Sequence, residues 1–122
     1  MTTTKRTIPT FHRGDVVLVL FPNSNLQSAK RRPGVIVQAD DLRTGLPQVI
    51  VAMITSRMDR ASHASRVAIR LGETAGQSSG LLNDSVVMTD NLATVFVSAI
   101  DRSIGSLPMT AVDEALRRTL NL

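Results

Sequence analysis

The chain has 122 residues, with 14 lysines and arginines against 10 aspartates and glutamates, and a formal net charge of +4 at pH 7. This length suffices for one domain with its own core. The absence of cysteine excludes disulfides, thiolate catalysis and cysteine-ligated zinc sites. The longest apolar run, residues 16–21, is too short to span a bilayer, and no apolar signal segment follows the opening charges. We therefore expect a cytoplasmic protein without a membrane segment.

The charge is unevenly distributed along the chain. Residues 1–70 hold 11 lysines and arginines against 4 acidic residues, whereas residues 71–122 hold 3 against 6. Clustered arginines favour a polyanionic partner, although many basic surfaces serve only to keep a protein soluble. Phe11, Phe21 and Phe96 are the only Phe, Tyr or Trp rings, which are too few to build a sheet platform for stacked bases.

Six segments rich in β-branched residues, each bounded by Gly, Pro, Asn, Asp or Ser, predict short strands. They are residues 15–21, 33–38, 48–55, 66–71, 85–89 and 93–100. Long polar loops are expected at residues 22–32 and 56–65, and a short helical turn at residues 39–43.

A C-terminal helix is predicted within residues 108–122, because Val112, Leu116 and Leu120 are spaced four apart. Thr110 and Asp113 resemble a capping box at its start, and Ser106 ahead of Pro108 is an alternative start. Short strands at close spacing with a terminal helix predict a mainly β (α+β) fold, a small and strongly bent barrel on which the helix packs. We expect residues 1–12 to form an N-terminal arm and residues 13–122 a single domain.

Three positive charges, Lys30, Arg31 and Arg32, precede Pro33 at the start of the second predicted strand. The residue before a proline is held extended, so Arg32 would project from a rigid backbone. Its planar guanidinium matches the oxygens of a phosphate group. The alternative is that Arg32 pairs with a carboxylate while its neighbours are solvated, and composition alone favours this alternative.

Thr55 and Ser56 end the third predicted strand, and Arg57 and Arg60 follow in the second polar loop. Hydroxyl groups facing a basic loop could bind a phosphate, although a Thr–Ser pair at a strand end ordinarily only caps a turn. His12 and His63 could suggest a two-histidine ribonuclease. Since nothing in the sequence fixes their separation, we expect two solvated side chains.

Four short motifs occur in an order that resembles the MazF/PemK family, the toxins of type II toxin–antitoxin pairs. They are RGDVVLV at residues 13–19, Arg–Pro at 32–33, Thr–Ser at 55–56 and SGLLNDSVVMTDN at 79–91. The resemblance implies an SH3-like barrel, also seen in CcdB, and a homodimer. It implies a sequence-specific, ribosome-independent endoribonuclease that cuts single-stranded mRNA, leaving 2′,3′-cyclic phosphate and 5′-OH ends without a metal or cofactor. It also implies a cognate antitoxin that blocks the RNA groove and joins the toxin in binding operator DNA.

The resemblance also implies roles for single residues. Arg32 matches the family's catalytic arginine and Thr55 its catalytic threonine, with Ser56 beside it, while Asp90 falls where PemK-type members have an acid implicated in catalysis. We expect Arg32 to stabilise the phosphorane, Thr55 and Ser56 to position the phosphate, and Asp90 to act as a base or an orienter.

The residues expected to bind RNA are Lys30, Arg31, Gln27, Arg57 and Arg60. Two positions depart from the PemK-type pattern: Met88 replaces an arginine and Leu26 replaces a histidine. Because of these departures the sequence assigns neither the general acid nor the general base. It also leaves two other functions open, a CcdB-like gyrase poison and a barrel that binds nucleic acid without cutting it.

Overall fold

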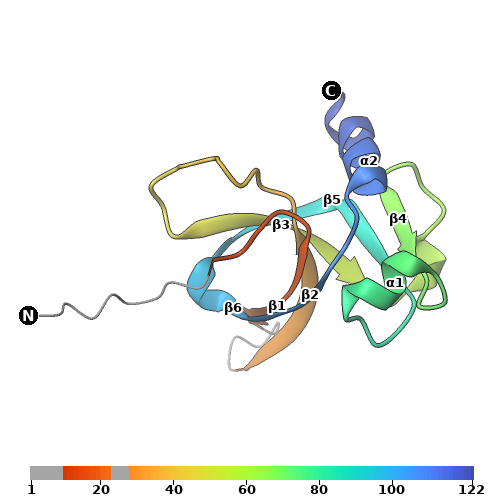
Figure 1. Cartoon of the computed structure of the whole chain (residues 1–122), viewed down its shortest axis with the longest axis horizontal. Coiled ribbons are helices and arrows are strands. Elements are labelled where there is room, and N and C mark those ends of the chain that lie inside the picture. The colour runs from red at the N-terminus through yellow and green to blue at the C-terminus, as the bar shows by residue number, and fades with distance from the viewer. Residues whose placement is uncertain (1–9, 23–27) are drawn as a thin grey trace, which may run out of the picture.

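The computed structural model describes residues 10–22 and 28–122. In these residues the chain forms a six-stranded antiparallel sheet with the strand order β4-β5-β3-β2-β1-β6 (Figure 1). The strands are β1 (Asp15–Pro22), β2 (Ala29–Ile36), β3 (Gln48–Thr55), β4 (Arg66–Ile69), β5 (Ser85–Phe96) and β6 (Ile100–Ser106). The helices are α1 (Thr74–Ser79) and α2 (Thr110–Leu120), with single 3-10 turns η1 (Met58–Arg60) and η2 (Val97–Ala99).

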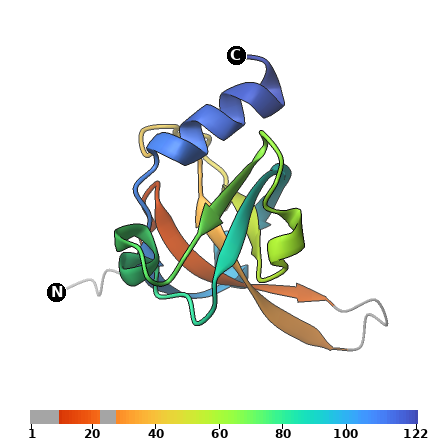
Figure 2. The same cartoon turned by 90° about the vertical axis from the view of Figure 1, so that its right-hand side faces the viewer.

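The sheet is strongly bent and carries an apolar cluster on each face, because successive side chains of a strand point to opposite sides. One cluster contains Val17, Val51 and Ile100. The other contains Val16 and Val112, and it is the side on which α2 packs against β4 and β5 (Figure 2). The prediction of a small, bent, mainly β barrel with a C-terminal helix is confirmed. The sheet is not closed, since β4 and β6 are its edges.

Strand β5 contains a bulge that positions part of the groove described below. Ala52 of β3 lies opposite Leu92, but the next residue, Met53, lies opposite Met88. Residues 89–91 are therefore extra on β5 and leave the ladder. The sequence predicted two strands here, at 85–89 and 93–100, with a break between them. The break is this bulge inside one strand, and β5 ends at Phe96.

Other boundaries also differ from the prediction. Strand β2 begins at Ala29, so residues 29–32 extend a hairpin with β1 rather than a loop (Figure 2). Residues 39–43 form no helix, only a turn closed by the Leu42 amide donating to the Ala39 carbonyl at 3.2 Å. Strand β6 and helix α1 were not predicted. Residues 1–9 of the expected N-terminal arm lie outside the described residues.

The predicted capping box is wrong. Helix α2 begins after Met109, which makes no side-chain cap, and the Asp113 carboxylate instead pairs with the Arg13 guanidinium at 2.5 Å. This ion pair ties the start of the helix to the start of β1. Within residues 10–22 and 28–122, no helix has the length and apolar content that a bilayer crossing needs.

Candidate functional site

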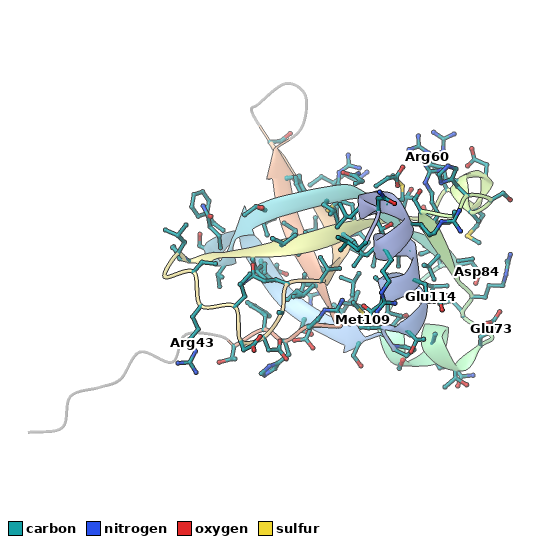
Figure 3. The ribbon with its side chains drawn as sticks, turned by 90° about the horizontal axis from the view of Figure 1, so that it is seen from above. Arg43, Arg60, Glu73, Asp84, Met109 and Glu114 are labelled. Carbon is teal, nitrogen blue, oxygen red and sulfur yellow. The ribbon has the colours of Figure 1, made fainter. Side chains whose placement is uncertain are left out.

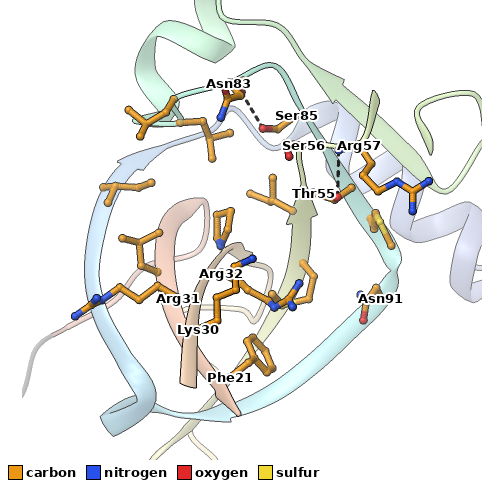
Figure 4. A pocket seen from close by; sticks show the side chains of 18 of the residues that line it. Phe21, Lys30, Arg31, Arg32, Thr55, Ser56, Arg57, Asn83, Ser85 and Asn91 are labelled. Carbon is orange, nitrogen blue, oxygen red and sulfur yellow. Dashed lines mark hydrogen bonds between the residues drawn. The ribbon is translucent and has the colours of Figure 1, made fainter. Parts of the chain in front are cut away.

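An open groove of about 820 Å³ lies where β2 and β3 diverge (Figure 4). Its wall comes from β1, β2, β3, β5 and β6, from the loop after β3, and from the loop between α1 and β5. The polar and charged residues that line it are Lys30, Arg31, Arg32, Thr55, Ser56, Arg57, Arg60, Asn83, Ser85, Asn91 and Arg102. The groove therefore brings together seven of the nine residues that the sequence singled out.

Pro33 explains why the strands diverge at this point. Just after β2, the Val37 amide donates to the Ile50 carbonyl at 3.1 Å, on the side of β3. Backbone groups alternate in direction along a strand, so Pro33 also faces β3, but its nitrogen carries no hydrogen. The ladder between the two strands ends beside it, at the pair Gly34 and Met53. The groove opens beyond that pair.

Arg32 and Lys30 contribute unpaired positive charge to the groove. They lie opposite Val19 and Phe21 on β1, so both stand on the sheet face that carries Met53. Within the described residues no carboxylate lies within ion-pair distance of either side chain. The alternative that Arg32 is neutralised by a carboxylate therefore has no partner in this part of the chain.

Arg31 belongs to the opposite face of β2, and its charge is partly compensated. Its Nε lies 3.2 Å from the Asp101 carboxylate, which also accepts from Arg102 at 2.8 Å. Arg31 and Arg102 nevertheless both line the groove, because the groove passes through the gap between the strands. Two arginines that share one carboxylate leave a net positive charge at this rim.

Thr55 ends β3 and lies on the same face of the sheet as Arg32. Both residues lie two positions beyond the last pair of the ladder between β2 and β3. Its hydroxyl oxygen accepts from the Arg57 amide at 3.2 Å, and its hydrogen stays available to a ligand. Ser56 follows and is exposed. Arg57 pairs with Asp59 at 3.0 Å, with both side chains exposed, while Arg60 has no ion-pair partner among the described residues.

Asp90 does not line the groove. Its two carboxylate oxygens accept from the Arg66 guanidinium, at 3.2 Å from Nε and 2.8 Å from Nη2. These hydrogen bonds lower the pKa of Asp90 and raise the pKa of Arg66. The neighbouring bulge residue, Asn91, lines the groove in its place, together with Met88.

Several lining residues were not singled out from the sequence. Leu82, which is exposed, and Asn83 line the groove from the loop before β5, and Asn91 lines it from β5; the two asparagines are labelled in Figure 4. All three fall inside the motif at residues 79–91, but only the bulge and the turn after α1 turn them toward the groove. Gln27 and Leu26 lie outside the described residues.

The two histidines are exposed and do not line the groove. His12 lies 4.0 Å from the Asp40 carboxylate. His63 Nδ1 lies 2.7 Å from the Ser65 hydroxyl, in the second loop. A ribonuclease site built from two histidines is therefore not formed.

Comparisons with known proteins show which family the chain belongs to. A family model described as PemK-like, MazF-like toxin of type II toxin-antitoxin system matches residues 12–121. Endoribonuclease MazF2 of Mycobacterium bovis (strain ATCC BAA-935 / AF2122/97) and endoribonuclease MazF6 of Mycobacterium tuberculosis (strain ATCC 25618 / H37Rv) are each 35% identical over 107 residues, which cover 84% of this chain and 90% of each relative.

Solved structures of a toxin and of an endoribonuclease resemble this chain over most of its length. The Mycobacterium tuberculosis toxin MazF-mt6 matches with a TM-score of 0.68 and 27% identity, over 88% of this chain and 97% of that chain. An endoribonuclease in complex with its cognate antitoxin, from a mycobacterial species, shares the fold with a TM-score of 0.70 and 20% identity, over 91% of this chain and 95% of that chain.

Proposed function

This chain belongs to the PemK-like, MazF-like toxins of type II toxin–antitoxin systems, and on that premise we propose that it binds single-stranded RNA in the groove between β2 and β3 and cuts it there. It is an endoribonuclease toxin that an antitoxin neutralises. The observation that carries the choice of site is the Arg32 guanidinium, which has no ion-pair partner within the described chain and lines the same open groove as Thr55.

In the proposed reaction the nucleophile belongs to the RNA itself. The ribose 2′-oxygen attacks the adjacent phosphorus, the bond from phosphorus to the 5′-oxygen breaks, and the products are a 2′,3′-cyclic phosphate and a 5′-OH. The proton lost by the 2′-OH passes to water, and the leaving 5′-oxygen takes up a proton from water. The protein contributes by orienting the phosphate for in-line attack and by stabilising charge on the phosphorane.

Arg32 is the residue suited to stabilising that charge. A guanidinium offers two parallel donors to the non-bridging oxygens and stays protonated at any working pH, so it binds charge but does not shuttle protons. The Thr55 and Ser56 hydroxyls hold the scissile phosphate in line. Arg31, Arg57 and Arg60, together with Lys30 and Gln27, bind the neighbouring phosphates.

Asp90 had two roles open to it, base or orienter, and its ion pair supports the second. A carboxylate whose pKa is lowered by an arginine is a weaker proton acceptor than a free one. It also lies outside the lining of the groove. We therefore assign Asp90 to orientation and leave proton transfer to water.

The proposal extends to partners. The antitoxin segment covers Arg32 and both basic loops, and it is acidic and disordered until bound, which lets it wrap an open groove. Hydrogen exchange of the complex checks this, and protection confined to α2 would contradict it. The toxin acts in the cytoplasm as a homodimer on short sequences without the ribosome, and it binds operator DNA only with its antitoxin.

End mapping tests the function directly. Pure protein is incubated with a long single-stranded RNA in EDTA, and both ends of every product are sequenced after enzymatic conversion of cyclic phosphates. The expected result is cleavage at a short recurring sequence with 2′,3′-cyclic phosphate and 5′-OH ends. Intact RNA that stays bound would favour the non-catalytic barrel, and inhibition of gyrase supercoiling without RNA cleavage would favour the CcdB-like function.

A further inference from the structure

Arg66, the first residue of β4, connects the bulge of β5 to the loop between β3 and β4. Its Nε and Nη2 donate to the carboxylate of Asp90 in the β5 bulge, at 3.2 and 2.8 Å. Its Nη1 donates to the backbone carbonyl of Arg60 at 3.2 Å. One guanidinium thus uses all three of its nitrogens, on the bulge and on the loop between β3 and β4.

A second contact fastens the same loop beside Arg66. The Ser65 carbonyl accepts from the Thr89 amide at 3.0 Å and from the Thr89 hydroxyl at 2.6 Å. The Thr89 oxygen also lies 2.7 Å from the Thr119 hydroxyl of α2. The end of the loop is therefore tied to bulge residues 89 and 90, and through them to the C-terminal helix.

The loop that is fastened in this way carries cations of the groove. Arg57 and Arg60 line the groove, and η1 begins after Arg57 and ends at Arg60. Within the described chain, the backbone hydrogen bonds of residues 58–63 run from Arg60 to Arg57, from Ala61 to Met58 and from His63 to Ala61, and the His63 carbonyl accepts from the Arg66 amide where β4 begins. None of these backbone bonds joins residues 58–62 to the sheet.

We propose that Arg66 is a positioning residue: by clamping the Arg60 carbonyl to the β5 bulge it holds the loop cations at the groove, and Asp90 acts on RNA only through Arg66. The inference rests on the proposed function, since it assigns Arg57 and Arg60 to RNA phosphates. It deepens that function by stating how Asp90 orients the site, namely by fixing the direction of the Arg66 guanidinium.

The physical basis is the shape of the guanidinium. Its nitrogens are fixed in one plane, so holding two of them on a carboxylate fixes the direction of the third toward the loop. The side chains of Arg66 and Asp90 are 23% and 35% exposed, so water competes only partly for these bonds. The hydrogen bonds between them raise the pKa of Arg66 and lower the pKa of Asp90, so each partner stabilises the ionised form of the other. A lysine could keep the charge but could not hold both partners.

Hydrogen exchange tests the clamp without RNA. In Arg66→Lys, Arg66→Gln and Asp90→Asn, the amides of residues 57–64 should exchange faster, on the order of tenfold, the factor expected for losing one charged hydrogen bond. Arg43→Gln removes the same charge at the opposite end of the molecule from Arg60 and should leave the loop unchanged (Figure 3). Unchanged exchange in the Arg66 variants, with thermal unfolding showing them folded, would overturn the proposal.

Kinetics then distinguishes positioning from proton transfer. Arg66→Gln and Asp90→Asn should raise KM more than they lower kcat. They should also make the slope of log K for RNA binding against log salt shallower by up to roughly 1.4, at about 0.7 for each phosphate contact of Arg57 and Arg60. The double variant should behave like either single one. If Asp90→Asn instead lowers kcat at unchanged KM, removes one limb of the pH profile and adds its full effect to Arg66→Gln, Asp90 acts as a base and the proposal fails.

Failure of the proposed function can be distinguished from failure of the proposed clamp. If the wild-type chain cleaves no RNA, the proposed function falls, while the exchange rates of the loop still decide whether Arg66 clamps it. If RNA is cleaved and the clamp variants leave the loop and the salt slope unchanged, only the positioning role falls.

Discussion

Gly80 lies directly against the backbone of Ile104: a Cβ built on Gly80 would be 1.9 Å from the Ile104 carbonyl oxygen. Gly80 also has a φ of +75°, in the left-handed region, where it ends α1. The close approach packs the end of α1 on β6, and from this point residues 80–85 run along the wall of the groove. Only a glycine satisfies both the contact and the dihedral angle.

A series of glycine substitutions separates these two requirements. Gly72→Ala meets no atom within 4 Å and should be close to neutral, whereas Gly45→Ala, with a φ of +77° and no neighbour, should cost about 1 to 2 kcal/mol of unfolding free energy. Gly80→Ala adds a clash with backbone and should cost at least about 3 kcal/mol. Urea denaturation measures all three. Equal stability of the Gly80 and Gly45 variants would contradict the close packing.

Arg32→Lys should separate charge from geometry at the proposed catalytic centre. It keeps the positive charge but loses the fork of donors, so RNA should still bind while kcat falls by about 10²–10³, as for losing one donor to a developing oxyanion. Arg43→Lys is the matched control and should cleave at the wild-type rate. Thr55→Ala should lower kcat, and Thr55→Ser should restore much of it by returning the hydroxyl. Wild-type cleavage by Arg32→Lys would restrict Arg32 to binding.

The ion pairs of the groove set the expected salt dependence. Lys30, Arg32 and Arg60 are unpaired within the described chain, whereas Arg31 and Arg57 already have carboxylate partners. At about 0.7 per phosphate on single strands, the slope of log K against log salt should lie between roughly −2.1 and −3.5. Fluorescence anisotropy with labelled RNA measures it. Lys30→Gln should reduce the slope by about 0.7, and a slope near zero would remove the loops from the RNA site.

Asp90 should contribute stability that depends on acid pH. Its pKa in the folded chain is lowered below the ordinary value of 3.8, chiefly by the hydrogen bonds from Arg66. A lowered carboxyl pKa gives stability that is fully present above 3.8 and is lost as the pH falls below it, through the pKa of the folded state. Urea midpoints between pH 6 and pH 3 should therefore converge for the wild type and Asp90→Asn. Asp41→Asn, an exposed carboxylate, is the control.

The sequence predicted the elements whose signal is local. The apolar run at 16–21, the strand at 48–55 and the 3.6-residue pattern ending at Leu120 correspond to β1, β3 and α2. Strand β6, with the sequence IDRSIGS, lacks such a signal because it is an edge strand paired only with β1. Helix α1 is six residues long, contains glycine and serine, and forms by packing on β6.

The groove was predictable in its residues but not in its layout. Arg32 and Thr55 came from short motifs, and the structure places both in the groove lining. Residues 29–32 have charged, strand-poor sequence and become strand only because β1 pairs with them. The contact between Arg66 and Asp90 joins positions 24 residues apart and depends on the length of the bulge, which no local pattern reports.

The bulge in β5 has a consequence for how such a chain can diversify. In a regular strand, inserting or deleting one residue turns every later side chain to the other face. Of residues 89–91, which lie outside the ladder, Thr89 and Asp90 fasten the loop between β3 and β4, whereas Asn91 can vary while Met88 and Leu92 keep their partners on β3. Substitutions at Asn91 can therefore change the groove wall during evolution, and with it the RNA sequences that the groove accepts, while the core strands stay in register.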